Sequence, residues 1–374
     1  MKKFVCLLLA LMLLPLCAPA EDVWVDSEPQ EIVHGTLYVY ADDDDSSAQS
    51  TAKSGPRVDP ENDSWPKEIV ITVGGDCTLG CTTTQHESPK GFDTVVAEKG
   101  LAWPFSGLAE LFSQDDLTLV NLEGPLTDAT LKTEKKFNFK GPAEYAQMLT
   151  VASVEAVNLA NNHYADYGDQ GKEDTIANLE AVGLVVSGGG MLGIFEKNGV
   201  KVGMTGYCFP YQNEKKDISK DVAALREAGC QIVIATFHWG SEYQSEFTRE
   251  QRLIGREAIT AGADIVVGHH PHVVQGIEQY DDTYILYSLG NLVFGGNVDP
   301  SDRDAYAARL TFTVYEDRCD PPELTVVPLR LTQNDKGATD YRPILAQDDE
   351  AVRIYNRILK LSYNMKEFVN GEWR

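Results

Sequence analysis

Three of the chain's seven histidines lie within four residues, in the segment Gly268–His272. The mostly apolar run 263–267 precedes them, and a short apolar run bounded by Gly and Pro is typical of a buried strand. The histidines therefore follow the end of a strand, where open α/β sheets bind ligands. His270 and His272 are two residues apart, so an extended backbone would point both imidazoles to one side. This predicts a site for one metal ion or a pair. The alternative is a surface loop without a ligand.

Side chains with oxygen or nitrogen donors follow other predicted strands in the same way. They are Asp76 after strand 69–73, Glu123 after 117–120, Asn162 and His163 after 156–160, His238 after 232–236 and Asn291 after 284–287. Donor sets without cysteine suit Mn²⁺, Zn²⁺, Fe²⁺ or Mg²⁺, and two such ions about 3.5–4 Å apart hold an activated water between them. The sequence thus predicts a site that attacks phosphoryl or acyl centres. At any single position the alternative is an ordinary turn aspartate or a locally hydrogen-bonded histidine.

A basic segment stands out in this acidic chain. Lys132, Lys135, Lys136 and Lys140 lie around two phenylalanines. The chain carries a formal net charge of −25 at pH 7, so its overall field repels a polyanion and any attraction must be local. The four lysines are therefore predicted to bind an anionic polymer, and the alternative is a solvated edge hairpin. The same net charge argues against nucleic acid as a partner.

The first 20 residues have the features of a signal peptide. Two lysines open the chain, an apolar stretch follows at 5–14, and Ala18–Ala20 fits a cleavage site. Cys17 would suit a lipoprotein, but Leu16 stands where a small residue is required, so we expect cleavage after residue 20. The protein is therefore predicted to be exported, either outside the cell or at the cell envelope. A retained N-terminal anchor is the alternative.

Composition divides the rest of the chain into three parts. Residues 21–66 are predicted to be an acidic, low-complexity linker, within which 37–40 is predicted to form a short strand. Residues 67–335 form the predicted folded domain, and 336–374 a C-terminal extension with an amphipathic helix over about 350–368. Five cysteines remain after the expected cleavage, and their odd number and sparse spacing do not make a disulfide scaffold. The chain is long enough to bury a core without one.

Strands and helices alternate through the predicted folded domain. The predicted helices are 170–181, 219–228 and 248–261, and the further predicted strands are 184–186, 200–207, 310–315 and 324–331. The last two strands alternate in polarity as antiparallel strands do. This order of elements predicts an α/β architecture with a substantial sheet.

Six motifs follow one another in a characteristic order. They are Gly74-Gly75-Asp76, Asn121-Leu122-Glu123-Gly124, Asn161-Asn162-His163, Phe237-His238-Trp239-Gly240, Gly268-His269-His270-Pro271-His272 and Ser288-Leu289-Gly290-Asn291. This series resembles the CapA-like family of bacterial capsule synthesis proteins, which is linked to poly-γ-glutamate and is similar to the calcineurin-like metallophosphoesterases. The resemblance covers about residues 68–331. It implies a four-layer α-β-β-α sandwich of two mixed sheets, with a dinuclear metal site at the strand ends.

The resemblance also implies roles for single residues. The implied metal ligands are Asp76, Glu123, Asn162, His238, His270 and His272, with His269 as an alternative first histidine of the last pair. His163 is the implied catalytic acid and Asp166 the residue that orients it. We expect His269 and Asn291 to contact substrate. The pattern departs at Thr78, where phosphoesterases usually have histidine, so one of the two ions would be weakly held or absent.

The implied function is capsule or exopolymer biosynthesis by an exported, metal-dependent protein. One hypothesis is a hydrolase or transferase that acts on a polymer such as poly-γ-glutamate. The alternative is a non-catalytic assembly or export factor that keeps the fold and binds polymer in its cleft. A general secreted phosphoesterase is less favoured because of Thr78. The expected partners are an anionic capsular polymer and a membrane-bound capsule ligase or export complex.

Overall fold

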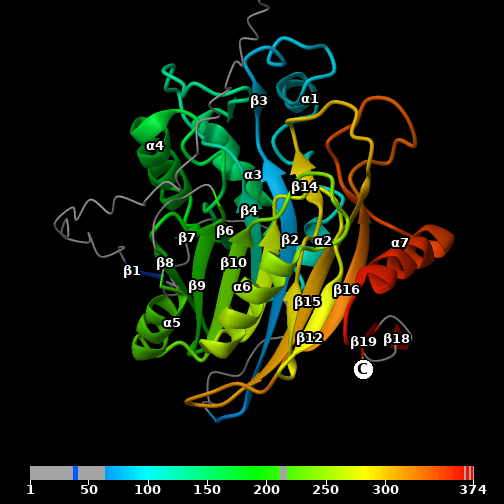
Figure 1. Ribbon diagram of the computed structural model, residues 1–374. Helices are drawn as coiled ribbons and strands as arrows, with labels where there is room; N and C mark the ends of the chain where they lie inside the picture. Colours follow the sequence, from blue (N-terminus) through cyan, green and yellow to red (C-terminus); the bar gives the residue numbers. More distant parts are fainter. Residues whose placement is uncertain (1–36, 41–63, 211–216, 366–367, 370–371, 374) are drawn as a thin grey trace, which may run out of the picture. The chain divides into compact units, whose positions relative to one another are not determined.

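A long strand, β2 (Lys67–Thr78), carries the first predicted metal ligand and forms the middle of the larger sheet. In the computed structural model it lies between antiparallel β15 (Asp304–Val314) and parallel β4 (Leu117–Leu122), as Figure 1 shows. Every residue of β2 from Ile71 onward is buried. A strand covered on both faces is mostly apolar, and this explains the run 69–73, apolar except for Thr72, that predicted it.

The structure describes residues 37–40, 64–210, 217–365, 368–369 and 372–373, all within the compact unit Gly35–Arg374. The predicted signal peptide and most of the predicted linker lie outside the described residues. Inside that linker, the predicted strand at 37–40 is confirmed as β1 (Leu37–Tyr40), which pairs in parallel with β8 (Leu192–Lys197). Within the described ranges, no helix has the length and apolar character needed to cross a bilayer.

The described strands form two large mixed sheets and a two-stranded ribbon. The strands not yet given are β3 (Cys81–Thr82), β5 (Phe139–Lys140), β6 (Ala156–Asn158), β7 (Val185–Ser187), β9 (Val200–Cys208), β10 (Ile232–His238), β11 (Ile265–His269), β12 (Ile277–Tyr280), β13 (Thr283–Leu286), β14 (Asn291–Phe294), β16 (Glu323–Arg330), β17 (Ile344–Leu345), β18 (Phe368–Val369) and β19 (Glu372–Trp373). The seven-stranded sheet has the order β1-β8-β9-β10-β11-β13-β12. The ten-stranded sheet has the order β18-β19-β16-β15-β2-β4-β6-β7, with β14 beside β2 and β17 beside β16. Strands β3 and β5 form the ribbon.

Three hydrophobic clusters hold these sheets and the helices together. The helices of the described residues are α1 (Phe92–Lys99), α2 (Ala109–Phe112), α3 (Ala146–Val151), α4 (Gly168–Glu180), α5 (Ile218–Glu227), α6 (Arg249–Thr260) and α7 (Asp348–Leu361), with a short 3₁₀ helix at Ala143–Tyr145. One cluster joins Ile71 of the larger sheet to Met204 and Ile234 of the smaller one. A second packs α1 to α4 on the ten-stranded sheet, and a third packs α5 and α6 on the seven-stranded sheet. The predicted α/β architecture is therefore confirmed.

The predicted helices at 170–181, 219–228 and 248–261 are confirmed as α4, α5 and α6, within two residues at each end. Local chemistry fixes two of their starts. Thr248 and Gln251 form a reciprocal capping box at α6, and the Asp217 side chain accepts from the Lys220 N–H at α5. Such caps satisfy backbone donors that the first turn of a helix leaves without partners.

The C-terminal helix is shorter than predicted. Helix α7 ends at Leu361 instead of near residue 368, because the backbone of Ser362 is extended and its hydroxyl donates to the Ile358 carbonyl. The sequence pattern predicts an apolar face formed by Val352, Tyr355, Ile358, Leu359 and Leu361, and this prediction is only partly confirmed. The buried side chains of α7 are Ile354 and Ile358, whereas Val352 and Leu359 are exposed.

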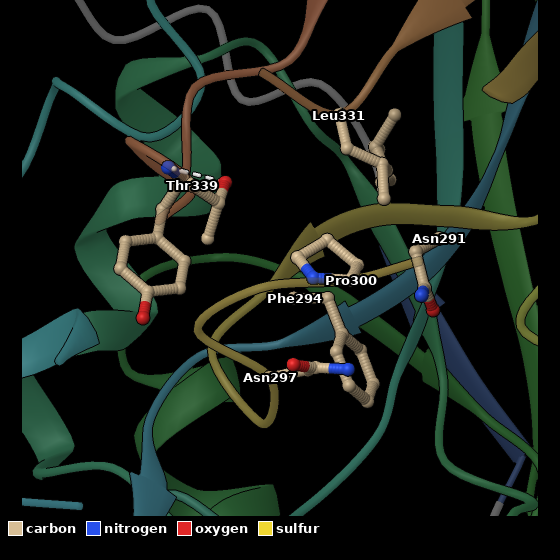
Figure 2. Close-up of a pocket in the computed structure, with 8 residues that line it drawn as sticks. Asn291, Phe294, Asn297, Pro300, Leu331 and Thr339 are labelled. Carbon is tan, nitrogen blue, oxygen red and sulfur yellow. Dashed lines mark hydrogen bonds between the residues drawn. The ribbon is translucent and has the colours of Figure 1, made fainter. Parts of the chain in front are cut away.

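A small cavity lies beside β14. Asn291, Phe294, Pro300 and Thr339 are among the residues that line it, as Figure 2 shows. Its volume is about 10 Å³, which is roughly what a single water requires. This cavity is too small to hold a metabolite or a polymer segment.

Candidate metal centre

Polar side chains occupy the carboxyl ends of neighbouring parallel strands in the ten-stranded sheet. Asp76 of β2, Asn121 of β4 and Asn158 of β6 lie side by side in register. Asn121 Nδ2 donates to Asp76 Oδ1 over 2.8 Å, and Asn158 Nδ2 donates to Asn121 Oδ1 over 2.8 Å. Glu123 follows directly after β4. Because parallel strands end at the same edge of a sheet, this hydrogen-bonded row holds both carboxylates at one place.

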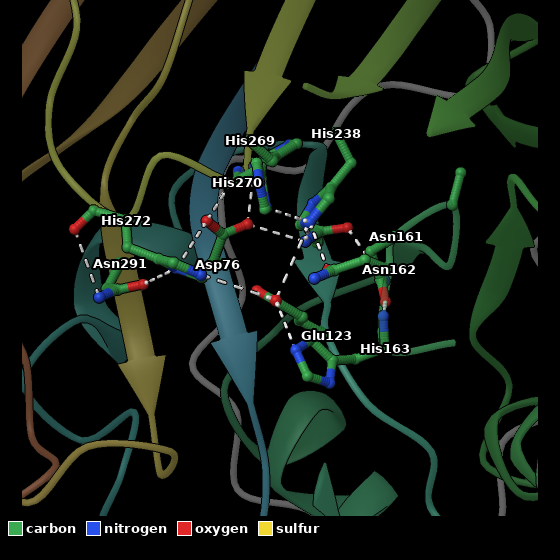
Figure 3. Close-up of polar contacts among 12 residues, drawn as sticks. Asp76, Glu123, Asn161, Asn162, His163, His238, His269, His270, His272 and Asn291 are labelled. Carbon is green, nitrogen blue, oxygen red and sulfur yellow. Dashed lines mark hydrogen bonds and ion pairs between the residues drawn. The ribbon is translucent and has the colours of Figure 1, made fainter. Parts of the chain in front are cut away.

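The seven-stranded sheet supplies the imidazoles. His238 ends β10, and His270 and His272 follow β11. The backbone N–H of His270 donates to Asp76 Oδ2 over 3.1 Å, so the two sheets meet at this point. Figure 3 shows the side chains from both sheets converging on Asp76 and Glu123.

The backbone after β11 is not extended, and the prediction that spacing alone aligns the two histidines is wrong. His270 has a φ of 97° and His272 a φ of 57°. Non-glycine residues rarely adopt such values, which cost about 1–3 kcal/mol each. The chain turns because the His270 N–H binds Asp76 while the His272 ring reaches Asn291, with Nδ1 2.8 Å from Asn291 Oδ1. The two rings still lie close, with centroids 5.9 Å apart.

All six predicted metal ligands come together, and we call them the strand-end cluster: Asp76, Glu123, Asn162, His238, His270 and His272. His238 Nε2 lies 2.8 Å from Asn162 Oδ1, 3.0 Å from His270 Nδ1 and 3.9 Å from Glu123 Oε1. His272 Nε2 lies 3.7 Å from Glu123 Oε1. One donor atom each from Asp76, Glu123 and His238 lies within 4.8 Å of the others, so a single cation could contact all three.

Glu123 shows most directly what the cluster lacks. Its side chain is fully buried, and neither carboxylate oxygen has a hydrogen-bond partner among the described residues. Burial, together with the charge of Asp76, raises the pKa of Glu123 well above its ordinary value. A buried carboxylate without donors is costly, and hard divalent cations take oxygen ligands of this kind. The residues present therefore fit a divalent metal ion.

The neighbouring groups are held in the protonation states that metal ligation needs. Burial and the adjacent imidazoles lower the pKa of His238 well below its usual value and that of His270 to about 4. Burial opposes the ionisation of Asp76, but the adjacent His269 and the other nearby imidazoles lower its pKa below the usual value. Neutral imidazoles and an ionised carboxylate are the forms that bind metal.

His163 lies at the edge of the strand-end cluster and forms a pair with Asp166. His163 Nδ1 lies 2.7 Å from Asp166 Oδ2, and its Nε2 lies 3.8 Å from Glu123 Oε1. Lys135 contacts the other oxygen of the buried Asp166, and the Phe139 N–H donates to Oδ2 over 2.6 Å. Burial lowers the pKa of His163, and Asp166 opposes this shift. With Nδ1 bound to Asp166, the Nε2 atom faces the cluster.

The four lysines of the basic segment do not share one environment. Lys135 Nζ contacts Asp166 and is therefore part of the support for His163. Lys140 Nζ donates to a loop carbonyl over 2.7 Å. Lys132 and Lys136 lie in an exposed stretch. The geometry therefore leaves two of the four lysines, Lys132 and Lys136, as surface charges for an anionic ligand.

The remaining predicted site residues lie behind the donors. His269 Nδ1 is 3.4 Å from Asp76 Oδ1, and the Asn291 side chain bonds to His272; both residues are buried. Partners in these positions orient metal ligands. Thr78 is buried, and its hydroxyl has no hydrogen-bond partner among the described residues.

Sequence reasoning gave no role at the site to Asn121. Its Nδ2 atom lies 3.4 Å from His238 Nδ1 and also donates to Asp76, so this side chain links the two sheets at the site. A signal was present, because Asn121 and Glu123 are two residues apart at a strand end and alternation puts such residues on one face.

Comparison with known proteins gives consistent matches. Residues 70–296 match the family model described as "Bacterial capsule synthesis protein PGA_cap". The chain is 31% identical over 243 residues to "PGA biosynthesis protein CapA" of Bacillus subtilis (strain 168), covering 59% of this chain and 62% of that one. It is 28% identical over 256 residues to "Capsule biosynthesis protein CapA" of Bacillus anthracis, covering 61% and 60%. The matches thus span about three fifths of the length of these relatives.

More distant likenesses have also been found. A probable polyglutamine synthesis accessory protein of Mycobacterium tuberculosis (strain CDC 1551 / Oshkosh) is 27% identical over 225 residues, covering 51% of this chain and 59% of that one. A solved structure of a hypothetical protein from Thermus thermophilus aligns with a TM-score of 0.41 and 15% identity, covering 70% of this chain and 99% of that one.

Proposed function

This chain belongs to the bacterial capsule synthesis protein PGA_cap family, and from that premise we propose that it is an exported, metal-dependent protein that acts on an anionic capsular polymer of the poly-γ-glutamate type. The names of its Bacillus relatives refer to PGA or capsule biosynthesis, which supports the polymer class. The signal-peptide features of the sequence support the proposed export. A membrane-bound ligase or export complex is the proposed partner.

The observation that carries the proposal concerns the buried Glu123, whose two carboxylate oxygens have no hydrogen-bond partner in the part of the chain that the structure describes. We propose that a divalent ion is held by Asp76, Glu123 and His238, whose donor atoms lie within mutual reach. Such an ion, when bound, activates water and stabilises negative charge on a phosphoryl or acyl group. The resemblance implies a second ion, and titration of the metal-free chain measures the number of ions bound.

The chain's own residues supply the remaining chemistry. Asp166 accepts from His163 Nδ1 and fixes the ring, so that Nε2 faces the strand-end cluster. We propose that His163 donates a proton from Nε2 to the leaving group of the scissile bond. Lys135 contacts the other oxygen of Asp166 and places a positive charge beside the carboxylate that holds the ring. This places a general acid next to the metal donors, on the side of Glu123.

The proposal has a structural part as well. The seven- and ten-stranded sheets share one cluster of apolar side chains, and helices pack on each sheet through a separate cluster. This arrangement supports the four-layer, metallophosphoesterase-like sandwich that the resemblance implies, and a site at the strand ends is where such folds carry their metals.

The alternative function is a non-catalytic polymer-binding factor for assembly or export. Thr78 favours it, because the chain has no histidine where phosphoesterases usually have one. In that case the metal would order the cleft and the exposed Lys132 and Lys136 would contact polymer.

One experiment distinguishes the two functions. The purified chain, stripped of metal and reloaded with Mn²⁺, Zn²⁺, Fe²⁺ or Mg²⁺, is incubated with poly-γ-glutamate and, separately, with phosphoester substrates. We expect metal-dependent shortening of the polymer or release of phosphate. Binding of the polymer without cleavage under every metal would establish the alternative. If the chain neither binds nor cleaves the polymer and releases no phosphate, the proposed function as a whole is refuted.

A further inference from the structure

A second group of potential metal ligands lies outside the strand-end cluster. Cys81 belongs to β3, Asp93 lies in the first turn of α1, and His86 lies in the turns between them. Cys81 Sγ donates to Asp93 Oδ2 over 2.9 Å, and His86 Nδ1 lies 2.7 Å from the same oxygen. One donor atom from each residue lies within 4.8 Å of the others. We call these three residues the Cys81 cluster.

Two glycines that flank the strands of the ribbon bring Cys81 to this position. Gly80 has a φ of 147°, and a Cβ there would lie 2.1 Å from the Lys140 carbonyl oxygen. A Cβ at Gly141 would lie equally close, 2.1 Å, to the Leu79 carbonyl oxygen. These approaches allow Cys81 and Lys140 to pair in the β3–β5 ribbon, beside the start of α1.

The surroundings of the Cys81 cluster are those of a site and not of a packed core. All three residues line a cavity of about 390 Å³. The His86 side chain is 68% exposed and that of Asp93 is 12% exposed, so a dissolved ion can reach them. Tyr145 OH donates to Asp93 Oδ1 over 2.8 Å and thereby fixes the carboxylate with Oδ2 toward the other two ligands.

We propose that the Cys81 cluster binds one Zn²⁺ through the Cys81 thiolate, the His86 imidazole and the Asp93 carboxylate, with the fourth position open to the adjoining cavity. Zinc accepts this mixture of sulfur, nitrogen and oxygen ligands, and three protein ligands with one open position is a common zinc arrangement. On binding, the proton that Cys81 donates to Asp93 passes to solvent, and bonds to the metal replace that hydrogen bond. The Tyr145 hydroxyl takes the part of an outer partner that orients the carboxylate.

This site would act on the ribbon that supports the proposed acid. Thr82 of β3 pairs with Phe139 of β5, and the Phe139 N–H donates to Asp166. The Phe139 ring also lies 4.4 Å from the His163 ring, measured between centroids. A zinc ion at Cys81 would therefore clamp the segment that holds the His163–Asp166 pair. The binding of zinc does not depend on the proposed function, since it rests on different residues.

Cobalt provides a test, because only one of the two sites contains sulfur. Titration of the metal-free full-length chain with Co²⁺ should produce thiolate-to-cobalt charge-transfer absorption, which Zn²⁺ then displaces. We expect this absorption to be lost in Cys81→Ser and in His86→Ala, with an affinity loss of more than about 100-fold in each, since even outer-shell changes cost about 10–100-fold. His86 is exposed, so His86→Ala is expected to fold even where Cys81→Ser does not.

Two control variants locate the signal. His238→Ala removes a donor of the strand-end cluster and should leave the charge-transfer absorption unchanged. In Cys319→Ser the lost cysteine also lies beside a carboxylate, Asp264, but the described residues place no histidine with this pair, and the absorption should again remain. An absorption that is missing from the wild-type chain, that persists in Cys81→Ser, or that disappears in Cys319→Ser would overturn the proposal.

A more conservative substitution tests the role of the Tyr145 hydroxyl. Tyr145→Phe removes the hydroxyl that orients Asp93 and should weaken Zn²⁺ binding by roughly 10–100-fold while the charge-transfer absorption at saturating Co²⁺ remains. Zn²⁺ should also slow amide exchange in residues 82–91 of the wild-type chain and not of His86→Ala. Equal exchange with and without Zn²⁺ would contradict a clamp at this loop.

Discussion

Two fully buried glutamates, Glu123 and Glu278, are treated in opposite ways by the same fold. Glu278 of β12 receives donors from Arg252 and Arg256 of α6 and from the hydroxyl of Tyr287, which lies 2.6 Å away. Glu123 has no donor to either oxygen among the described residues, and its nearest imidazole nitrogens lie 3.7 Å and more away. The fold can therefore supply hydrogen-bond donors to a buried carboxylate, as it does at Glu278.

The difference indicates that Glu123 is kept for a partner outside the chain. Removing a charged side chain from water without hydrogen bonds is unfavourable, and such a residue persists where it has a use. Around Glu278 the positive charges are arginines, fixed in the chain. Around Glu123 the neighbours are imidazoles and Asp76, a set that becomes favourable when a cation joins it.

The largest expected effect separates the two glutamates by metal content. Glu123→Gln and His238→Ala should each lower metal affinity well beyond the roughly 10–100-fold that outer-shell changes cost. Glu278→Gln is the matched control and should bind metal as the wild type does. Elemental analysis and titration calorimetry measure both. Wild-type metal content in Glu123→Gln would show that the Glu123 carboxylate does not bind the metal.

The second largest effect tests whether His163 acts as the general acid beside Glu123. His163→Ala should keep its metal and lower turnover on substrates with poor leaving groups by about 100-fold or more, as loss of a general acid does. Activated esters, which need no proton, should be spared. Burial lowers the pKa of His163, and the acid must be protonated to act. Activity should therefore fall as pH rises through a value below the ordinary ~6.5.

The pH–rate profile of His163→Ala supplies the check on that assignment. The limb that depends on a protonated histidine should be absent from the variant and present in the wild type. If His163→Ala loses metal instead, His163 is a ligand, and the general acid is another residue.

Stability should change differently at the two glutamates. Glu278→Gln leaves two arginines facing a neutral side chain, and since both arginines are about one-third exposed we expect a loss of roughly 2–3 kcal/mol, below the range for a fully buried pair. Glu123→Gln in metal-free protein should be neutral or stabilising, because it removes a buried carboxylate without donors. Denaturant unfolding in the presence of a chelator measures both. A large loss in metal-free Glu123→Gln would show that its carboxylate has an internal partner.

The smallest expected effect concerns the surface lysines. The double charge reversal Lys132→Glu with Lys136→Glu should weaken binding of poly-γ-glutamate several-fold at low salt and much less at physiological salt, where the Debye length is about 8 Å. Lys135 is left intact, because it contacts Asp166. The metal content of the variant should equal that of the wild type. Polymer binding that is equal at all salt concentrations would exclude a role for these two lysines.

Local signals made much of the site predictable. The metal donors follow apolar runs at strand ends, and both the runs and the polar residues after them can be recognised in one dimension. The alternation of strands with three amphipathic segments indicated the α/β class. Asp76, Glu123 and His238 were found in this way, and the structure brings them within reach of one another.

What escaped prediction depends on contacts between distant segments. The position of Asn291 beside Asp76 follows from the pairing of β14 with β2, more than 200 residues apart in sequence. The left-handed backbone at His270 arises because Asp76, on the other sheet, binds its N–H. The sequence spacing of Cys81 to its cluster partners fits no familiar zinc motif. Their geometry depends on the ribbon, where Gly80 closely approaches Lys140.

The same dependence applies to the basic segment and to the last helix. Four lysines within nine residues indicate a patch, yet only the fold shows that Lys135 contacts a buried aspartate. The sequence predicted a helix to about residue 368, and the extended backbone at Ser362 that ends α7 is a detail that periodicity does not carry.

Donors from both sheets meet at the strand-end cluster, and this has a consequence for the folding of the chain. Asp76 and Glu123 come from one sheet and His238 from the other, so high-affinity binding requires the two sheets to be docked. A contact completed only in the final docking step is absent from the transition state, and stabilising it slows unfolding while leaving the folding rate nearly unchanged. Metal occupancy would then change how slowly the protein unfolds more than how quickly it folds.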